Sequence, residues 1–210
     1  MKLYRANIRE TLVDTTEILT PKNCADLKAQ NVAGVIRYLY NLSRPELNVI
    51  LASGLACFFV NYSRKVGWTP SAADGAADGA RDVKALQALG IPIGVHIAFD
   101  LEGPGGTADL VIEHVTAHAK TVVQSGYIQS LYMGEGPLIS SAQAYALPYT
   151  TLYWQSCSLI RDAAGHDVVP ACRYALVQLY PPDQMLAGVE VDYNTVQSDT
   201  KNRYPIGVAA

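Results

Sequence analysis

Two acidic residues at the end of an apolar segment have the types and spacing that point most directly to chemistry. Asp100 and Glu102 follow residues 95–99, which have the composition of a buried parallel strand. Residues two apart on an extended strand face the same side, with Cα atoms about 7 Å apart. Paired carboxylates in unequal environments can cleave glycosidic bonds, with one as a protonated acid and the other as a charged stabiliser or nucleophile. The alternative is that Asp100 caps a turn and Glu102 is solvated.

Further polar and aromatic residues stand where other strands are expected to end. They are Asp14, Arg37, Tyr62, Tyr132, Trp154, Gln155, Gln178, Asp192 and Asn194. If the strands close into a barrel, their carboxyl ends meet at one face, where barrel active sites form. Carboxylates and amides suit sugar hydroxyls, and aromatic rings stack on the C–H faces of sugars. The set predicts a carbohydrate site, with ordinary loop polarity as the alternative.

Strand-like and helix-like segments alternate through most of the chain and would position these residues. The expected strands cover 11–14, 33–39, 55–62, 95–102, 127–133, 150–155, 174–180 and 189–192, and the expected helices cover 22–30, 43–54, 75–89, 107–125 and 140–145. This order predicts an α/β chain that forms one domain over residues 1–210, a (β/α)8 TIM-like barrel with an irregular second half. A doubly wound open sheet is the alternative, but no G-x-G-x-x-G or Walker loop follows any strand.

Composition excludes several classes of protein. The chain has 210 residues, of which 50% are hydrophobic and 17% charged, as in globular proteins. A net charge of −3 provides no basic surface for nucleic acid, and no apolar run approaches the roughly 20 residues of a membrane helix. We therefore expect neither a nucleic-acid nor a membrane partner, and we expect a monomer. The first ten residues contain no apolar signal-peptide region, which leaves the cytoplasm, or release by a non-classical route such as host lysis by a phage.

Histidine and cysteine spacings offer little support for a metal site. The four cysteines lack any C-x-x-C spacing, and whether Cys157 and Cys172 form a disulfide stays open. His114 and His118 have the i, i+4 spacing of a metal pair, but no third ligand of matching spacing accompanies them. We interpret this pair as part of a solvated helix face, and His96 as a hydrogen-bonded residue of the core or barrel lumen.

Two residues near the expected mouth have alternative interpretations. Glu135 lies in a Gly-Glu-Gly turn after the fifth strand and is the best rival to Glu102 as an acid. Its flanking glycines explain its exposure without any function. Trp68, in the loop after the third strand, is either a lid over the cleft or a surface anchor.

Four short motifs, taken in their order along the chain, resemble the family 25 glycoside hydrolases. They occupy residues 13–15 (VDT), 99–102 (FDLE), 153–155 (YWQ) and 191–194 (VDYN). Members of that family are lysozymes that cut the β-1,4 bond after N-acetylmuramic acid in peptidoglycan. The sequence is more similar still to their glycoside-hydrolase-like relatives of unknown function, which share residues 34–39 (GVIRYL) and 54–55 (GL). The resemblance covers nearly the whole chain and implies an irregular α/β barrel.

The resemblance also implies roles for the acids. Glu102 would be the general acid, kept protonated by burial and neighbouring carboxylates. Asp100 would stabilise developing positive charge by orienting the substrate's 2-acetamido group as an internal nucleophile. Asp14 and Asp192 would complete the acidic floor.

The expected substrate contacts come from strand ends around the acids. Trp154 and Tyr132 would be sugar platforms, and the remaining substrate-binding residues would be Arg37, Tyr62, Gln155, Gln178 and Asn194. The implied partner is peptidoglycan or a related amino-sugar polymer, and the reaction would need no metal or organic cofactor.

Two departures from the lysozyme pattern leave a second hypothesis open. Residues 103–106 (GPGG) predict a loose loop where many relatives keep tighter substrate contacts. Arg37 is typical of the uncharacterised relatives, and it could pair with Asp14 or Asp100. The alternative function is therefore a non-catalytic barrel that binds carbohydrate or cell wall and has lost turnover.

Overall fold

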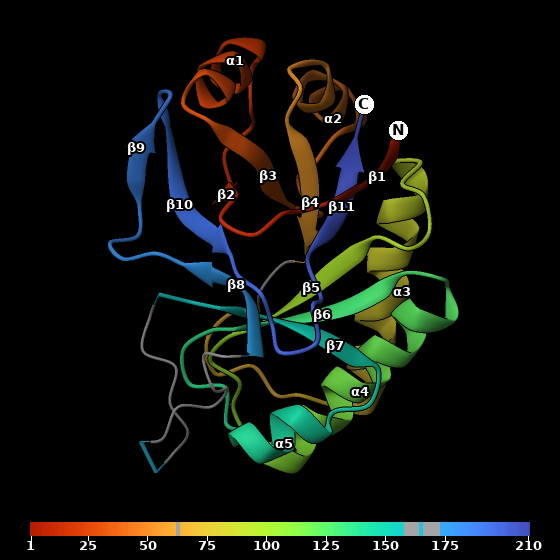
Figure 1. The fold of residues 1–210 in the computed structure, drawn as a ribbon. Coiled ribbons are helices and arrows are strands. Elements are labelled where there is room, and N and C mark those ends of the chain that lie inside the picture. The colour runs from red at the N-terminus through yellow and green to blue at the C-terminus, as the bar shows by residue number, and fades with distance from the viewer. Residues whose placement is uncertain (62–63, 158–163, 166–172) are drawn as a thin grey trace.

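A closed ring of eight strands forms the centre of the protein. The computed structural model describes residues 1–61, 64–157, 164–165 and 173–210. The barrel strands are β2 (Thr11–Thr15), β3 (Val32–Tyr38), β4 (Ala56–Val60), β5 (His96–Leu101), β6 (Ile128–Met133), β7 (Thr150–Gln155), β8 (Tyr174–Gln178) and β10 (Val189–Val196). Their order is β4-β3-β2-β10-β8-β7-β6-β5, and β5 pairs again with β4 (Figure 1). This closure confirms the predicted TIM-like barrel and excludes the open sheet.

The eighth barrel strand runs against its neighbours. β10 is antiparallel to both β2 and β8, whereas the other neighbouring strands are parallel. A parallel return needs a crossover of a dozen or more residues, and here only a short excursion through β9 (Gln184–Leu186) precedes β10. Asp192 and Asn194 therefore lie inside a strand, not at or after its carboxyl end as predicted. They still reach the mouth because Asp192 stands opposite Asp14.

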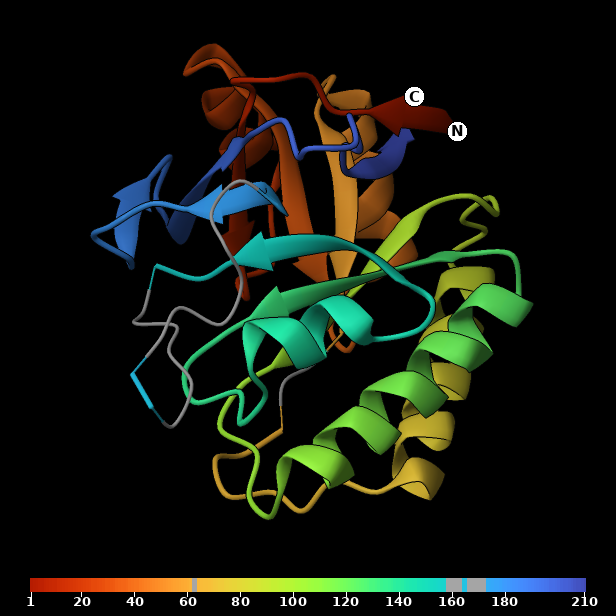
Figure 2. The same ribbon diagram turned by 60° about the horizontal axis from the view of Figure 1, so that its bottom comes forward.

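In the part of the chain that the structure describes, five helices cover the outside of the barrel. They are α1 (Pro21–Ala29), α2 (Arg44–Ala52), α3 (Ala72–Ala88), α4 (Ala108–Gln124) and α5 (Ser141–Ala146). Each begins after a Ser or Thr whose side chain accepts a hydrogen bond from a first-turn amide, as in α2, where Ser43 caps the Glu46 amide. Helices α1 and α2 lie beside β3 and β4, and α3 and α4 run side by side along β5 and β6 (Figures 1 and 2). Among the described helices, none is both long and apolar enough to cross a membrane.

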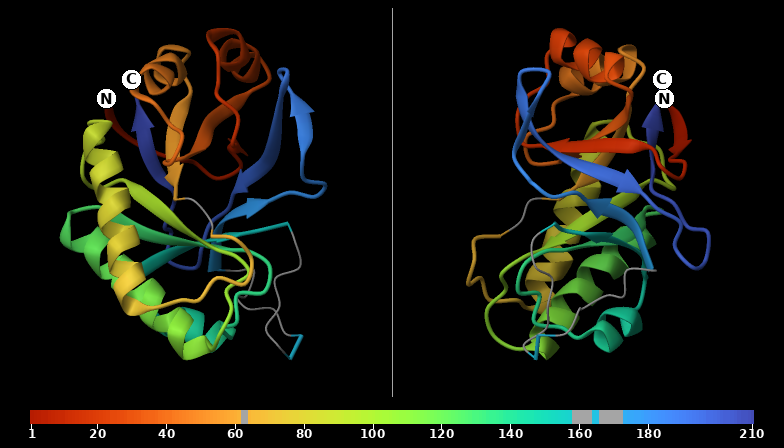
Figure 3. Two further views of the ribbon diagram at one scale, coloured as in Figure 1. Left: turned by 180° about the vertical axis from the view of Figure 1, so that it is seen from behind. Right: turned by 60° about the vertical axis from the view of Figure 1, so that its left-hand side comes forward.

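Two glycines of α3 allow α4 to approach closely. A Cβ atom on Gly75 would lie 2.1 Å from the carbonyl oxygen of His114, and one on Gly79 would lie 2.8 Å from that of His118. Both histidines are fully buried between the helices, so the prediction of a solvated helix face was wrong. His118 Nε2 lies 2.8 Å from an Asp82 carboxylate oxygen, which compensates the burial of both groups. The view from behind shows the two helices packed together (Figure 3).

The two chain ends pair beside the barrel. β1 (Lys2–Arg5) and β11 (Ile206–Ala209) form an antiparallel pair, and β11 also pairs with β4, so the termini lie side by side (Figure 3). The sequence analysis did not expect these strands or β9. The backbone amide of Ile206 donates to His96 Nδ1 at 3.0 Å, which confirms His96 as a buried, hydrogen-bonded residue.

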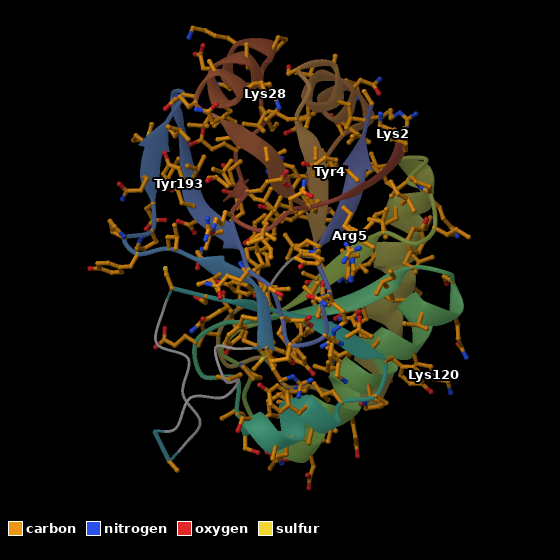
Figure 4. The ribbon with its side chains drawn as sticks, in the orientation of Figure 1. Lys2, Tyr4, Arg5, Lys28, Lys120 and Tyr193 are labelled. Carbon is orange, nitrogen blue, oxygen red and sulfur yellow. The ribbon has the colours of Figure 1, made fainter. Side chains whose placement is uncertain are left out.

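Apolar side chains fill both sides of the barrel wall. Inward-facing residues such as Leu12, Ile36 and Phe58 form a cluster within the barrel. A second cluster joins the wall to α1, α2 and α3, and a third joins β5, β6 and β7 to α4 and α5. Lys28 on α1 and Lys120 on α4 are exposed on the outer helices (Figure 4). Below the mouth the barrel interior is therefore lined largely by apolar side chains, with His96 and Ser130 among them.

Candidate active site

The four acids that the sequence analysis selected converge at one mouth of the barrel. Asp14 and Asp100 are the next-to-last residues of β2 and β5, Glu102 directly follows β5, and Asp192 stands opposite Asp14 across the β2–β10 pair. Tyr38, at the end of β3, lies among them. Burial raises the pKa of the Tyr38 hydroxyl well above its usual range, and the negative charges of all four acids raise it further. Four strands, β2, β3, β5 and β10, thus contribute to one polar site at this mouth.

Asp14 is deeply buried and has a strongly raised pKa. It is 5% exposed, and burial together with the charge of Asp192 raises its pKa to about 8. The side-chain amide of Asn194 donates to Asp14 Oδ2 at 2.6 Å and opposes this rise. At neutral pH the protonated form of Asp14 therefore predominates, which relieves repulsion among the carboxylates.

Asp192 accepts a hydrogen bond at each of its two carboxylate oxygens. Gln178 Nε2 donates to one carboxylate oxygen at 2.5 Å, and the backbone amide of Asp183 donates to the other at 2.6 Å. Burial raises the pKa of Asp192, the nearby Asp183 charge adds to the rise, and the two donors oppose it. The two donors favour the charged form of Asp192 and so oppose the effect of burial.

Glu102 combines partial exposure with a raised pKa. Burial is the largest cause, and the charges of Glu135 and Asp192 add to it, while the nearby Tyr132 hydroxyl opposes it. Glu135 is held nearby because its carbonyl oxygen accepts a hydrogen bond from the Gly103 amide at 2.9 Å. Glu135, the predicted rival, therefore lies beside Glu102 and favours its protonated form.

An aromatic and amide layer lies directly beneath the acids. The Trp154 indole donates to Asn194 Oδ1 at 2.7 Å, and the Tyr132 hydroxyl donates to Gln178 Oε1 at 3.1 Å. The two rings meet edge to face with centroids 4.4 Å apart. Trp154 is only 3% exposed and Tyr132 only 7% exposed, so neither ring offers the open stacking face predicted for a sugar platform. They instead support the two amides that hold Asp14 and Asp192.

Two predicted substrate contacts, Arg37 and Gln155, do not join this cluster. Arg37 is fully buried on the outer side of β3, where its Nε lies 2.9 Å from Glu46 Oε1, and it pairs with neither Asp14 nor Asp100. It also donates to the carbonyl oxygen of Thr15. Gln155 follows Trp154 directly, so the pleat turns it to the outer side of β7. Tyr62 lies outside the described residues.

Two further polar residues at the mouth, Asn61 and Asp183, were not predicted from the sequence. Asn61 is 1% exposed, and its side-chain oxygen accepts the Asp100 amide at 2.8 Å. Asp183 holds Asp192 and lines a polar pocket that also includes Asp14 and Tyr38. Asn61 could have been found, since it follows an apolar strand just as Asp100 does. Asp183 gave no comparable signal because it belongs to an irregular turn.

The loop after Glu102 is not loose, contrary to prediction. The Gly67 amide donates to the Gly103 carbonyl at 2.8 Å, and the Gly105 amide donates to the Trp68 carbonyl at 2.7 Å. The Trp68 indole donates to the Glu102 carbonyl at 2.9 Å. Trp68 therefore links two loops of the mouth.

Metal and thiol chemistry find little support in the described part of the chain. Within it, no group of three or more His, Cys, Asp or Glu side chains is arranged to hold a metal ion. Cys157 carries a free thiol, and Cys172, with which a disulfide was considered, lies outside the described residues. The chemistry available at the mouth is therefore that of carboxyl, amide and phenol groups.

Comparison with known proteins identifies both a family and a fold. The sequence profile described as "Rv2525c-like, glycoside hydrolase-like domain" matches residues 25–196. Among curated protein sequences, none gives a significant match.

Solved structures with the same fold include two proteins of similar size. An uncharacterized Bacillus stearothermophilus protein has a TM-score of 0.69 and 17% identity, with 90% of this chain and 96% of that chain covered. The Mycobacterium tuberculosis Tat-secreted protein Rv2525c, solved with L-tartrate, has a TM-score of 0.67 and 17% identity, with 90% and 95% covered. The catalytic domain of endolysin ply40 from a Listeria monocytogenes bacteriophage has a TM-score of 0.60 and 15% identity, with 92% and 95% covered. At these identities the similarity establishes a shared fold.

Proposed function

The chain belongs to the Rv2525c-like, glycoside hydrolase-like domain family, and from this premise we propose that it is a lysozyme-like glycoside hydrolase. The bond cleaved is the β-1,4 bond of peptidoglycan or a related amino-sugar polymer. The observation that carries the proposal is the convergence of Asp14, Asp100, Glu102 and Asp192 at one barrel mouth. The similar fold of a phage endolysin domain and of a Streptomyces coelicolor lysozyme supports a cell-wall glycan as the substrate.

Glu102 is the general acid in this proposal. Burial and the charges of Glu135 and Asp192 raise its pKa, which favours the protonated form that an acid needs near neutral pH. Its proton passes to the glycosidic oxygen as the bond from that oxygen to the anomeric carbon breaks. The resulting Glu102 carboxylate then accepts a proton from the attacking water.

Asp100 acts on the substrate's own 2-acetamido group. The acetamido oxygen attacks the anomeric carbon while the leaving oxygen departs, and the negative charge of Asp100 stabilises the positive charge that forms on the acetamido nitrogen. Hydrogen bonding of its amide to Asn61 anchors this end of β5. Water then opens the cyclic intermediate and restores the acetamido group. Asp192 contributes negative charge, and neutral Asp14 offers a hydrogen-bond donor to the sugar.

The test is clearing of purified cell-wall suspensions by wild-type protein and by Glu102→Gln. General acid catalysis contributes roughly 10²–10⁴-fold, so we expect an initial rate at least about 100-fold lower for the variant. The matched control is Glu113→Gln, which makes the same change on the exposed face of α4. Asp100→Asn should slow clearing as well.

Two outcomes would contradict the proposal. Equal clearing by wild type and Glu102→Gln would remove Glu102 as the acid. Binding of the glycan by wild type without clearing would favour the second hypothesis, in which the barrel binds carbohydrate and has lost turnover. A sedimentation assay with the same cell walls measures that binding.

A further inference from the structure

We propose that Gly134 and Trp68 are positioning residues that hold the Glu102 carboxyl at its place in the barrel mouth. This inference deepens the proposed hydrolysis and rests on it. Gly134 directly follows β6, whose neighbour β5 leads into Glu102, and Trp68 lies in the loop between β4 and α3. The sequence motifs and the family resemblance drew attention to neither residue as a support for Glu102.

Gly134 lies directly beside the side chain of Glu102. A Cβ atom at this position would stand 2.0 Å from Glu102 Cγ, 2.4 Å from Oε1 and 2.6 Å from Cδ. These distances are far below van der Waals contact, and Cγ is close to the backbone, so rotation of the carboxyl alone would not relieve the clash. The Gly134 amide donates to the Leu101 carbonyl at 3.1 Å, which prevents the glycine from moving aside. Any larger residue at position 134 must displace Glu102.

The conformation of the turn does not explain why residue 134 is glycine. Gly134 has no positive φ angle, so other residues could adopt its backbone conformation. Gly136, two residues later, has a φ of +60°, and a Cβ atom added there would meet nothing within 4 Å. The two glycines of this turn are therefore required for different reasons. Gly136 allows the positive φ angle, and Gly134 leaves room for the side chain of Glu102.

Trp68 fixes the backbone of Glu102 from the other side. Its indole donates to the Glu102 carbonyl at 2.9 Å, and its ring packs edge to face on buried His114 with centroids 4.9 Å apart. Arg64 lies over the same ring at 5.4 Å and forms an ion pair with Asp78 of α3 at 2.6 Å. The tryptophan is thus tied to the α3–α4 layer as well as to the mouth.

The two contacts act on different parts of Glu102. Trp68 holds the main chain, and Gly134 limits where the side chain can lie. Together they keep the carboxyl near Glu135 and Asp192, whose charges favour its protonated form. A side chain pushed away from Gly134 would gain solvent and lose these neighbours, so its pKa would fall toward the usual value.

The experiment compares Gly134→Ala and Trp68→Phe with the control Gly136→Asn, since asparagine tolerates the positive φ at this position. The readout is the titration of the Glu102 carboxyl by ¹³C NMR in protein with labelled glutamate, with the signal assigned by its absence in Glu102→Gln. This readout does not depend on turnover. Circular dichroism confirms that each variant is folded.

We expect Gly134→Ala to lower the Glu102 midpoint by at least about one pH unit, because solvent then reaches the carboxyl. A displacement near 1 Å costs on the order of 100-fold in rate, so kcat for cell-wall cleavage should fall by about that factor while KM changes little. Trp68→Phe should lower the midpoint and kcat less, since it keeps the ring and loses the hydrogen bond. Gly136→Asn should leave the midpoint unchanged, because an added Cβ at this position meets nothing within 4 Å.

Folded Gly134→Ala with an unchanged midpoint and unchanged kcat would overturn the proposal. If Gly134→Ala does not fold, an unchanged midpoint in Trp68→Phe would overturn it instead. If wild type clears no cell wall and the midpoint still moves in Gly134→Ala, the hydrolysis proposal fails while the positioning of Glu102 is supported.

Discussion

Replacing Asp14 by asparagine is expected to change how the stability of the protein depends on pH. Burial and the charge of Asp192 raise the folded-state pKa of Asp14 to about 8. An aspartate in an unfolded chain titrates near pH 3.9. Between these two values the folded state holds a proton that the unfolded state has released. The free energy of unfolding therefore falls as pH rises across this window.

The size of the effect follows from the width of that window. Each pH unit changes the free energy of unfolding by about 1.4 kcal/mol for one proton, so the change between pH 5 and pH 8 is at most about 4 kcal/mol. Asp192 and Glu102 lie close to Asp14 and also bind protons, so Asp14 titrates over a wider pH range. We therefore expect an observed change in the free energy of unfolding of about 2–4 kcal/mol. The side chain introduced by Asp14→Asn does not titrate, and its oxygen can still accept the hydrogen bond from Asn194.

Urea denaturation at pH 5 and pH 8 measures this difference directly. We subtract the free energy of unfolding of wild type from that of Asp14→Asn at each pH. This difference should be about 2–4 kcal/mol more positive at pH 8 than at pH 5. The control is Asp109→Asn, an exposed aspartate in the first turn of α4, which should move both values equally. If wild type and Asp14→Asn lose stability in parallel from pH 5 to pH 8, Asp14 does not hold the proton and the assignment of charges at the mouth is refuted.

Two further predictions concern the layers outside the barrel. Arg37→Met should lower the free energy of unfolding by about 3–5 kcal/mol, because it leaves the Glu46 carboxylate buried without its charged partner. A loss below about 1 kcal/mol in urea denaturation would show that this pair contributes little. Gly75→Ala should lower Tm by about 2–10 °C, because the new Cβ would lie 2.1 Å from the His114 carbonyl oxygen and force α3 from α4. Ala76→Ser, at an exposed position on the same helix, should leave Tm near the wild-type value, and an equal Tm for Gly75→Ala would contradict the close packing.

Much of the fold could be predicted because its signals are local. Ser43 with Glu46, and Thr107 before an apolar stripe, marked helix starts that the structure confirms. The reversed direction of β10 could not be predicted, because it depends on how the chain returns after β8. The pairing of β1 with β11 joins the two ends of the chain, and no local pattern reports such a contact.

Some residues of the site could likewise be predicted from local sequence, and others depended on tertiary contacts. Asp100 and Glu102 were identifiable because two acids directly follow an apolar strand. Arg37 was misplaced because it lies one residue before Tyr38, and a single step along a strand reverses the side of the sheet. The roles of Trp154 and Trp68 depended on partners far away in the chain, Asn194 and Glu102.

The sequence by itself determined that alternating strands and helices would form a barrel and that acids would stand at its strand ends, because periodicity and caps act between near neighbours. Only the tertiary structure decided which of those side chains face the mouth, that Asp14 and Asp192 stand opposite each other, and that Gly134 leaves room for Glu102. The physical reason is that charge, burial and close contact depend on distances in space. Those distances are set when remote strands pair and the ring closes.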